Sequence, residues 1–474
     1  MTGFVSDPPA APTASARWGV AAVLLGTMVV PLDSAVNIDF PLITRHFALA
    51  IPQIQWIVIS YTLTNASLML ICGRLADILG YRRVFLAGTA WSAVAFALCA
   101  LAPDYPWLLA ARVLQGIGAG LILSCGPALI TAFYPEAQRA RALGLYTLGF
   151  GLGGALGPAL GGVLIARFGW SAVFWARAPI AALGCLAGLA LPSPPRTGAR
   201  ESFDLPGAVL MVVTISALLA ALNQIGHPAR AAAALGFAVL AGAALVRREG
   251  RARHPIIDPR LFRLPGFAWV NLGFVAVNLA GFTVLLLAPF ALARLPGLST
   301  AAAGMVLAAS PAGIMLAGPL AGRLAAAVPA AGLMTAGASV VALGLAAIAL
   351  AGGGVPAGVP AGVAGLVAAM LVQGLGLGVF QVAYFDVVTG TIPLRDRGVA
   401  GSLGMLTRTL GLVAGASLLM TLFQGFRTAA TAGGLAEAAA FGAGFRATFL
   451  CAAALAGVIV AVDLLRWVRR TARE

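Results

Sequence analysis

The sequence of 474 residues contains no lysine, and only 9% of its residues are charged. Soluble domains carry about 25% charged residues, so this low content, together with 61% hydrophobic residues, excludes a large soluble protein and indicates an integral membrane protein. All 30 basic residues are arginines, scattered in short loops between apolar runs. Because they form neither a patch nor a basic arm, the net charge of +15 does not indicate nucleic-acid binding.

Groups that carry enzymatic or metal chemistry are also scarce. The three histidines are isolated, and the five cysteines lie within or beside apolar runs without the spacing of metal ligands. The sequence contains no nucleophile–base pair and no nucleotide-binding motif, which argues against an enzyme and against a pump driven by ATP. We therefore expect neither a metal nor a cofactor.

Long apolar runs recur along the chain, each long enough to span a bilayer as an α-helix. We predict an all-α integral membrane protein with fourteen transmembrane helices. The predicted spans are Trp18–Phe40, Ile54–Gly73, Val84–Ala102, Leu108–Phe133, Ala142–Ala166, Ala172–Leu191, Leu205–Gln224, Ala231–Val246, Phe267–Leu292, Ala301–Leu320, Ala331–Ala351, Gly362–Phe385, Val399–Leu422 and Phe445–Trp467. No basic region or cleavage signal accompanies the first span, so we expect it to remain in the mature protein.

The arginines predict the orientation. If the N-terminus is cytoplasmic, 21 of the 30 fall on the cytoplasmic side, six on the opposite side, and three (Arg112, Arg177 and Arg408) at membrane depth. Loops rich in arginine face the cytoplasm, so both termini are expected there, in a bacterial cytoplasmic membrane.

Two polar segments that contain proline and arginine divide the chain into sets of six, two and six helices. The predicted organisation is a cytoplasmic tail at 1–17, an N-terminal six-helix bundle at 18–191, a linker at 192–204, an inserted helix pair at 205–246, a second linker at 247–266, a C-terminal six-helix bundle at 267–467 and a tail at 468–474.

The two sets of six helices contain matching segments. Arg112 begins the string Arg-Val-Leu-Gln-Gly-Ile-Gly-Ala-Gly, and Met370 begins Met-Leu-Val-Gln-Gly-Leu-Gly-Leu-Gly at the corresponding place in the second set. A second pair of segments ends at Asp77 and at Gly322. Such repeats are typical of secondary transporters, whose substrate sites lie between the repeats near the midplane.

Asp33 lies inside the first apolar run, roughly 22 Å along a helix that crosses about 30 Å of hydrocarbon. An ionised carboxylate at such a depth costs at least ~2.5 kcal/mol. Two interpretations remain open: a buried carboxylate that a neighbouring donor satisfies, or a functional group. Intramembrane acids are functional by default, so we favour the second.

The motifs together resemble the major facilitator superfamily, and within it the fourteen-helix drug:proton antiporter family (EmrB/QacA-like). The segment from Gly73 to Arg83 resembles the superfamily's signature loop between helices two and three, with Gly73, Asp77, Gly80, Arg82 and Arg83 at the matching positions. In this loop Asp77 can accept hydrogen bonds from arginines or from a helix N-terminus and so hold helices together during gating. Gly322 stands at its place in the second set, which predicts a weaker contact there.

Arg112, Gln115 and Gly118 resemble the family's fourth-helix motif, whose arginine is implicated in proton transfer. Arginine stays protonated in proteins, so Arg112 would hold the charge of an acid or orient water; the alternative is an arginine that snorkels to the outer membrane edge. The segment around Asp33 and Asn37 is similar to the first-helix motif of the fourteen-helix branch, and we assign proton coupling to Asp33, Arg112 and Asp39. At the position of Asp39 the family more often has a small apolar residue. Asp39 is either a second titrating site or an acid near the outer interface.

The fifth predicted helix carries glycines at four-residue spacing: Gly153, Gly157 and Gly161, with a bend expected at Pro158. A GxGxxG string occurs here, but no strand precedes it, which excludes a dinucleotide site. The segment resembles the motif characteristic of antiporters, which is thought to seal and hinge the interface between the repeats. It favours export over uptake.

Other polar residues at membrane depth are candidates for a substrate cavity, or alternatively for hydrogen bonds between helices. They are Asn37, Tyr61, Asn65, Gln115, Asn271, Asn278, Gln373, Gln381, Tyr384, Asp386 and Arg408. Arg177 has no role that the sequence assigns.

The resemblance implies a monomeric, proton-coupled exporter of drugs or other amphipathic small molecules that works by alternating access in the lipid bilayer. Its partners would be the small-molecule substrate and protons. Alternatives are a dedicated exporter of one antibiotic or secondary metabolite, and a proton-coupled uptake symporter. Three acids oppose three arginines at membrane depth, so the sequence predicts no preference for the charge of the substrate.

Overall fold

The computed structural model describes residues 14–38, 40–49, 55–135, 138–191, 204–223, 228–252, 259–292, 294–295, 298, 300–352, 360–393 and 397–471. Within these ranges every regular element is a helix. The N-terminal helices are α1 (Ala14–Met28), η1 (Pro31–Ser34), α2 (Ala35–Ile38), α3 (Phe40–His46), α4 (Gln55–Leu79), α5 (Tyr81–Ala100), α6 (Tyr105–Thr131), α7 (Arg139–Phe168) and α8 (Ala172–Leu189). The others are α9 (Leu205–Asn223), α10 (Pro228–Glu249), η4 (Pro259–Arg263), α11 (Phe267–Leu292), α12 (Thr300–Leu307), α13 (Ala309–Leu324), α14 (Ala330–Gly352), α15 (Pro360–Thr391), α16 (Arg397–Ala432) and α17 (Glu437–Thr471).

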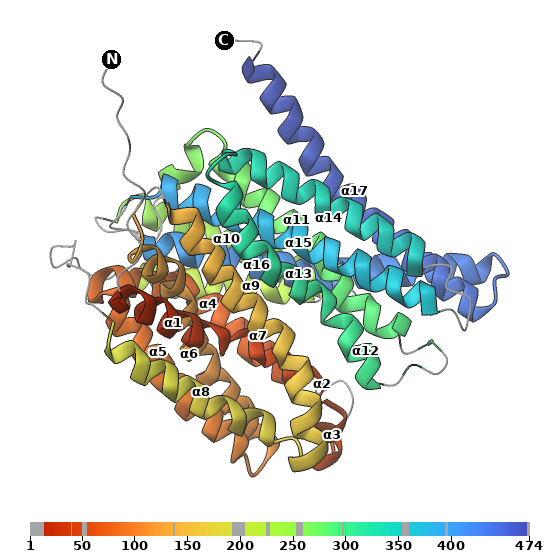
Figure 1. Cartoon of the computed structure of the whole chain (residues 1–474), viewed down its shortest axis with the longest axis horizontal. Helices are drawn as coiled ribbons and strands as arrows, with labels where there is room; N and C mark the ends of the chain where they lie inside the picture. The colour runs from red at the N-terminus through yellow and green to blue at the C-terminus, as the bar shows by residue number, and fades with distance from the viewer. Residues whose placement is uncertain are drawn as a thin grey trace.

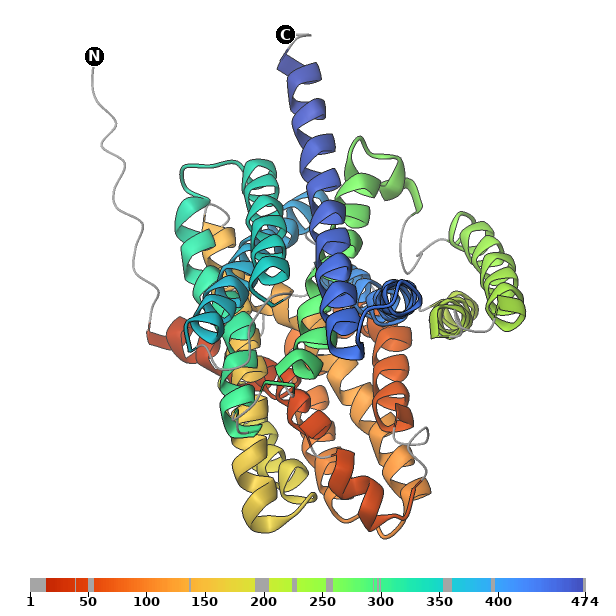
Figure 2. The same cartoon turned by 90° about the vertical axis from the view of Figure 1, so that its right-hand side faces the viewer.

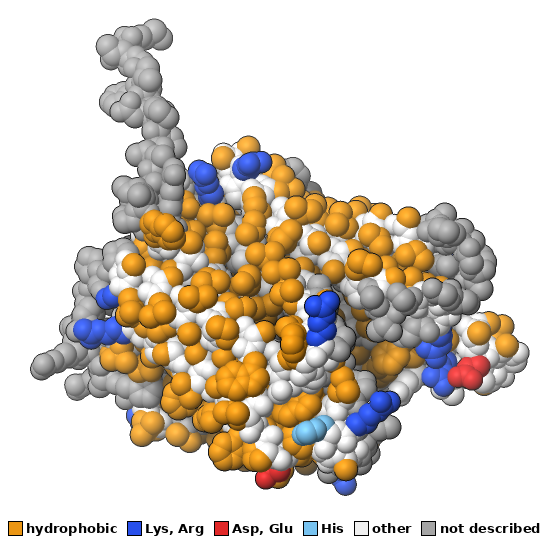
Figure 3. All heavy atoms as spheres, turned by 60° about the horizontal axis from the view of Figure 1, so that its bottom comes forward, with side chains coloured by type: hydrophobic (Ala, Val, Ile, Leu, Met, Phe, Trp, Pro, Cys, Tyr) orange, Lys and Arg blue, Asp and Glu red, His pale blue; other side chains and the backbone are white. Residues whose placement is uncertain are grey.

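Each predicted span coincides with one of these helices or with a broken helix. Among the described residues, eleven helical segments are long and apolar enough to cross a bilayer, and Trp18–Ser34 and Leu205–Ala221 are shorter apolar helices. Large apolar side chains such as Leu240 and Met305 are more than two-thirds exposed, and orange hydrophobic side chains cover most of the face in Figure 3. Such a surface requires lipid rather than water around it.

The first span is not the single helix that we predicted over Trp18–Phe40. The α-helix α1 ends at Met28, and Pro31 begins the 3₁₀ turn η1, which Ala35 continues as α2. Proline has no amide proton and its ring clashes with the preceding turn, so the helix breaks. Asp33 therefore lies in a tight turn inside the membrane rather than on a regular helix.

The N-terminal helices α1–α8 (red to yellow) and the C-terminal helices α11–α17 (green to blue) gather on different sides in Figure 1. Within the first group α6 packs on α4 and α5, and within the second α15 packs on α13 and α14. The two groups meet chiefly where α7 packs on α13 and where α4 and α6 pack on α16.

The matching glycine strings of α6 and α15 explain this similar packing. A methyl group on most of these glycines would collide with neighbouring backbone or side-chain atoms, whereas one on Gly120 would lie 3.5 Å from Cys72 Sγ. Such approaches are Gly116 to Tyr61, Gly118 to Ser92, Gly374 to Ser310, Gly376 to Val341 and Gly378 to Ala317. The repeated string therefore performs the same packing in both sets.

The pair α9 and α10 stands at one side of the molecule, in yellow-green at the right of Figure 2. Helix α9 packs against the membrane helices α4 and α16, and the hydroxyls of Ser67 and Ser216 are 3.0 Å apart. Asp204 accepts hydrogen bonds from Arg248 at the start of this pair, and the bond lowers the pKa of its carboxyl. The division of the chain into bundles and linkers remains a prediction.

Candidate functional site

The Asp33 carboxylate is the centre of a charged cluster within the N-terminal helices. Arg112, which is completely buried, donates from Nη1 to Asp33 Oδ1 at 2.6 Å and from Nη2 to Oδ2 at 2.8 Å. Gln115 lies one turn further along α6 and donates from Nε2 to Oδ1 at 2.9 Å. This forked geometry is the strongest ion pairing that proteins offer, so Arg112 does not snorkel to the membrane edge.

Arg177 is the member of this cluster that sequence reasoning missed. Its Nη1 donates to Asp33 Oδ1 at 2.5 Å, and its Nε donates to the Val173 carbonyl at 3.2 Å. An arginine at membrane depth requires a counter-ion. Because Asp33 is an acid at membrane depth, this requirement could have predicted that Arg177 pairs with Asp33. The cluster holds two guanidinium groups and one carboxylate, so it carries a net charge of +1 when Asp33 is ionised.

Aromatic rings and a carbonyl hold the two arginines in place. Arg112 lies 4.6 Å from the centre of the Tyr61 ring and donates from Nε to the Ile57 carbonyl at 3.0 Å. Arg177 lies 4.5 Å from the Phe96 ring and 5.1 Å from the Phe174 ring. Cation–π contacts are strongest where water is excluded, so these rings stabilise the charges away from bulk water.

The glycines of α7 pack directly on the turn that carries Asp33. A methyl group on Gly153 would collide with the Met28 carbonyl and lie 2.7 Å from Pro31 Cγ. One on Gly157 would collide with the Ser34 hydroxyl, and one on Gly161 would lie 2.9 Å from Ala35 Cβ. The segment that resembles the antiporter motif is therefore the wall against which the broken first span rests.

Asp77 joins the N-terminal helices to α16. Its Oδ2 accepts from the Val399 amide at 3.3 Å, near the start of α16, and its Oδ1 accepts from the Tyr81 hydroxyl at 2.8 Å. The positive end of a helix dipole favours a carboxylate at this place. Gly80 begins the next helix with a φ of 95°, a conformation that favours glycine.

A second contact between the two groups of helices lies nearby. Arg139 at the start of α7 donates from Nε to Asp386 Oδ1 on α15 at 2.7 Å. Arg82 donates to the Leu189 carbonyl at 2.6 Å, and Arg83 is exposed. We call the Asp77–Val399 and Arg139–Asp386 contacts the gate contacts. Gly322 packs against the Arg141 backbone, where a methyl group would lie 2.8 Å from Arg141 Cα, so a side chain like that of Asp77 has no room.

Most of the other predicted cavity residues bond to each other or to the backbone. Tyr384 donates to Asn271 at 2.8 Å, Gln381 donates to Asn278 at 3.4 Å, and the Ser310 hydroxyl donates to Gln373 at 2.7 Å. Asn65 is buried, and its Oδ1 has no hydrogen-bond partner in the part of the chain that the structure describes. Asp39 lies outside the described residues, as do the side chains of Asn37 and Pro158.

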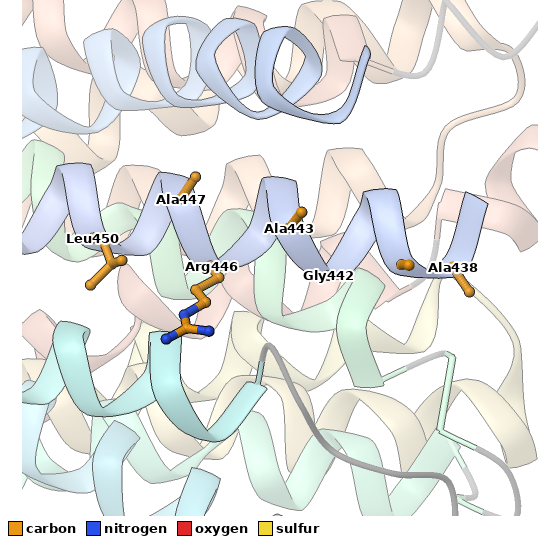
Figure 4. A pocket seen from close by; sticks show the side chains of 7 residues that line it. Ala438, Gly442, Ala443, Arg446, Ala447 and Leu450 are labelled. Carbon is orange, nitrogen blue, oxygen red and sulfur yellow. The ribbon is translucent and has the colours of Figure 1, made fainter. Parts of the chain in front are cut away.

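A surface hollow on α17 has a volume of about 470 Å³. Figure 4 shows its lining, in which Arg446 is the only charged side chain among alanines, a glycine and Leu450. All lining residues belong to one helix, so this is an open groove on the outside of the bundle. It does not provide the enclosing walls that a small-molecule site requires.

Known proteins resemble the chain over most of its length. It is 28% identical over 411 residues to the riboflavin transporter RibZ of Clostridioides difficile, covering 86% of this chain and 88% of that one. It is 30% identical to the multidrug efflux pump LfrA of Mycolicibacterium smegmatis (90% and 84%) and 33% identical to the cephamycin export protein CmcT of Amycolatopsis lactamdurans (83% and 82%). The model of the Major Facilitator Superfamily matches residues 23–416. The chain is thus a multi-pass membrane protein that belongs to the Major Facilitator Superfamily, a family of transporters.

Proposed function

We propose that the protein is a proton-coupled exporter of amphipathic small molecules, of the fourteen-helix drug:proton antiporter type. The observation that carries this proposal is the Asp33 cluster, in which one carboxylate inside the membrane accepts from Arg112, Arg177 and Gln115. Protonation of Asp33 would deprive two buried guanidinium groups of their counter-ion. Proton binding must therefore accompany a movement of the arginines away from Asp33.

The surroundings of Asp33 link such a movement to the rest of the molecule. Asp33 lies in a 3₁₀ turn that packs on the glycines of α7, and α7 carries Arg139 of the gate contacts at its other end. With both termini cytoplasmic, as the arginine distribution favours, the gate contacts close the cytoplasmic side. Release of the gate contacts would then open the inward-facing state of an alternating-access cycle.

The energetics of one proton per cycle suffice for export. A proton that crosses a potential of 100 mV supplies about 2.3 kcal/mol, and one pH unit adds about 1.4 kcal/mol. Together they support a substrate gradient of a few hundredfold. The proposed setting is the bacterial cytoplasmic membrane, the proposed state a monomer, and the proposed organisation the two six-helix bundles with an inserted pair.

The test is transport by purified protein in liposomes with an imposed pH gradient, using ethidium, rhodamine 123 and fluorescein. We expect Asp33→Asn to abolish transport driven by the gradient while exchange of dye without a gradient persists. Asp463→Asn is the matched control, because Asp463 is an acid of α17 that accepts only from Trp269 in the described bonds, at 2.6 Å. Gradient-driven transport by Asp33→Asn, or none by the wild type with any dye, would contradict the proposal.

The second candidate is a dedicated exporter, favoured by the similarity to the cephamycin export protein. Expression in a drug-sensitive host separates the two: resistance to one compound alone supports the dedicated exporter, and resistance to several supports broad export. Accumulation of dye rather than its loss would instead support uptake.

A further inference from the structure

A small cavity lies between the two groups of helices, apart from the bonds that hold Asp33. It has a volume of about 10 Å³, which is room for about one water molecule. Its lining comes from three helices: Tyr146, Thr147 and Phe150 of α7, Gln381 and Phe385 of α15, and Met405 and Arg408 of α16. A cavity at the junction of the repeats is where secondary transporters bind substrate.

Arg408 is the charged residue of this cavity, and it has no acidic partner among the described residues. Its guanidinium lies 4.5 Å from the centre of the Phe150 ring, and its buried Nε makes no hydrogen bond. A cation at membrane depth is costly unless it is paired. Arginine at such a place, without a counter-ion of its own, indicates that the missing anion comes from a ligand.

Tyr146 supplies a second unused donor to the same cavity. Its side chain is 2% exposed, and its hydroxyl has no hydrogen-bond partner in the described structure. Buried polar groups are nearly always hydrogen-bonded, so two unsatisfied donors on one cavity are unusual. Arg408 Nε requires an acceptor, and the Tyr146 hydroxyl can donate to the same acceptor.

The acids that might have balanced Arg408 are engaged elsewhere. Asp33 pairs with two arginines, and Asp386 pairs with Arg139 at the gate contacts. The three acids and three arginines that the sequence places at membrane depth therefore do not pair one to one among the described residues. Around the junction of the helices the described charges are predominantly positive.

We propose that the cavity of Arg408, Tyr146 and Phe150 is the recognition site for an anionic, aromatic substrate, such as an aromatic carboxylate or phenolate. Arg408 pairs with the anionic group, the Tyr146 hydroxyl donates to it, and the Phe150 and Phe385 rings contact the aromatic part. At about 10 Å³ the site is closed around its own side chains, so the helices must separate to admit a ligand. The inference deepens the proposed function by naming the substrate class, and its role as a transport site rests on that function.

An anionic substrate fits export. A membrane potential of 100 mV, negative inside, favours a monovalent anion outside the cell by about fiftyfold. Uptake of the same anion would oppose that potential. The positive charge of the cavity and the proposed direction of transport therefore agree.

The test compares two dyes that share the same xanthene ring system, anionic fluorescein and cationic rhodamine 123. Binding of each to purified full-length protein is measured by fluorescence polarisation at neutral pH, with no membrane and no gradient. We expect the wild type to bind fluorescein at least tenfold more tightly than rhodamine 123. Tighter or equal binding of rhodamine 123, or no measurable binding of fluorescein, would overturn the proposal.

Variants assign the preference to this cavity. Arg408→Gln should weaken fluorescein binding by about tenfold or more, as expected for a lost charge-assisted hydrogen bond, without weakening rhodamine 123. Arg294→Gln is the matched control, because Arg294 is an exposed arginine that also lies on an aromatic ring, 3.8 Å from the centre of Phe441. An unchanged fluorescein affinity in Arg408→Gln, or an equal loss in Arg294→Gln, would refute the assignment.

Two further variants keep the test valid if Arg408→Gln does not fold. Arg408→Lys retains the charge and should bind fluorescein more tightly than rhodamine 123, and Tyr146→Phe should lose fluorescein affinity severalfold while the ring remains. Reversed dye preference in Arg408→Lys together with wild-type affinity in Tyr146→Phe would overturn the proposal. Binding of fluorescein needs no proton, so it should persist in Asp33→Asn. If fluorescein binds as expected but transport is not coupled to protons, only the proposed exporter function is refuted, and the proposed recognition site is not.

Discussion

The packing of α7 on the Asp33 turn makes a prediction for two adjacent residues. Gly153 faces the Met28 carbonyl and the Pro31 ring, neither of which can move aside without moving the turn, whereas the nearest atom to a methyl group on Gly154 is Pro311 Cβ at 3.9 Å. Overpacking costs about 1–3 kcal/mol, and alanine gains about 1 kcal/mol over glycine in a helix. Because this gain is common to both positions, Gly153→Ala should be less stable than Gly154→Ala by about 1–3 kcal/mol.

The assay is the midpoint of thermal unfolding of both variants in the same detergent, followed by gradient-driven dye transport in liposomes. Gly154→Ala should melt at or above the wild-type temperature and transport normally. Gly153→Ala should melt below Gly154→Ala and lose transport, since the displaced turn carries Asp33 away from Arg112 and Arg177. If the two variants melt together, or if Gly153→Ala transports as well as the wild type, the close packing has no functional role.

Two further predictions concern the gate contacts and the inserted helix pair. Asp386→Arg alone should raise the labelling of a cysteine introduced near Arg139 severalfold, because loss of a partly exposed ion pair costs about 1 kcal/mol. The exchanged pair, Arg139→Asp with Asp386→Arg, should return the labelling to the wild-type level. Equal labelling in the single and double variants would argue against the pair. The hydrogen bond from Arg248 lowers the pKa of Asp204 from its ordinary value of 3.8, so its contribution to stability is complete above pH 3.8 and is lost as the pH falls through the lowered pKa. Hydrogen exchange at the start of α9 should therefore be faster in Asp204→Asn than in the wild type at pH 7 and nearly equal in strongly acidic buffer; a difference that persists in acid would exclude this origin.

The membrane spans were predictable because hydrophobicity alone determines them. The ends of the helices were less predictable. Helix α16 extends to Ala432, beyond the apolar run that ends at Leu422, and α17 begins at Glu437, before the apolar run that begins at Phe445. Alanines in these extensions favour helix without favouring lipid, so hydrophobicity underestimates the lengths. Pro31 could have predicted the break in the first span, but the apolar run continues past it and favoured a single helix.

The site was predictable in its residues and only partly in its pairing. Asp33 was predicted as a functional group from the energy of a charge in lipid, and the local motif pointed to Arg112. The contact of Arg177 with Asp33 joins residues separated by 144 positions, which no local pattern specifies. The same applies to Arg408, which has no acidic partner among the described residues, because this depends on where the acids lie in three dimensions.

One helix, α7, contacts every part of this arrangement: Arg139 at one end, Tyr146 and Phe150 along its length, and the glycines beneath the Asp33 turn. It crosses α13 where Gly144 and Gly318 approach through their backbones, with no side chain between them. Such a contact between two backbones offers few side chains that would resist a tilt of α7, a helix of 30 residues, about the crossing. In the proposed export cycle, a small tilt about this crossing would move both ends of α7, and it would thereby couple proton uptake, substrate release and opening of the gate contacts.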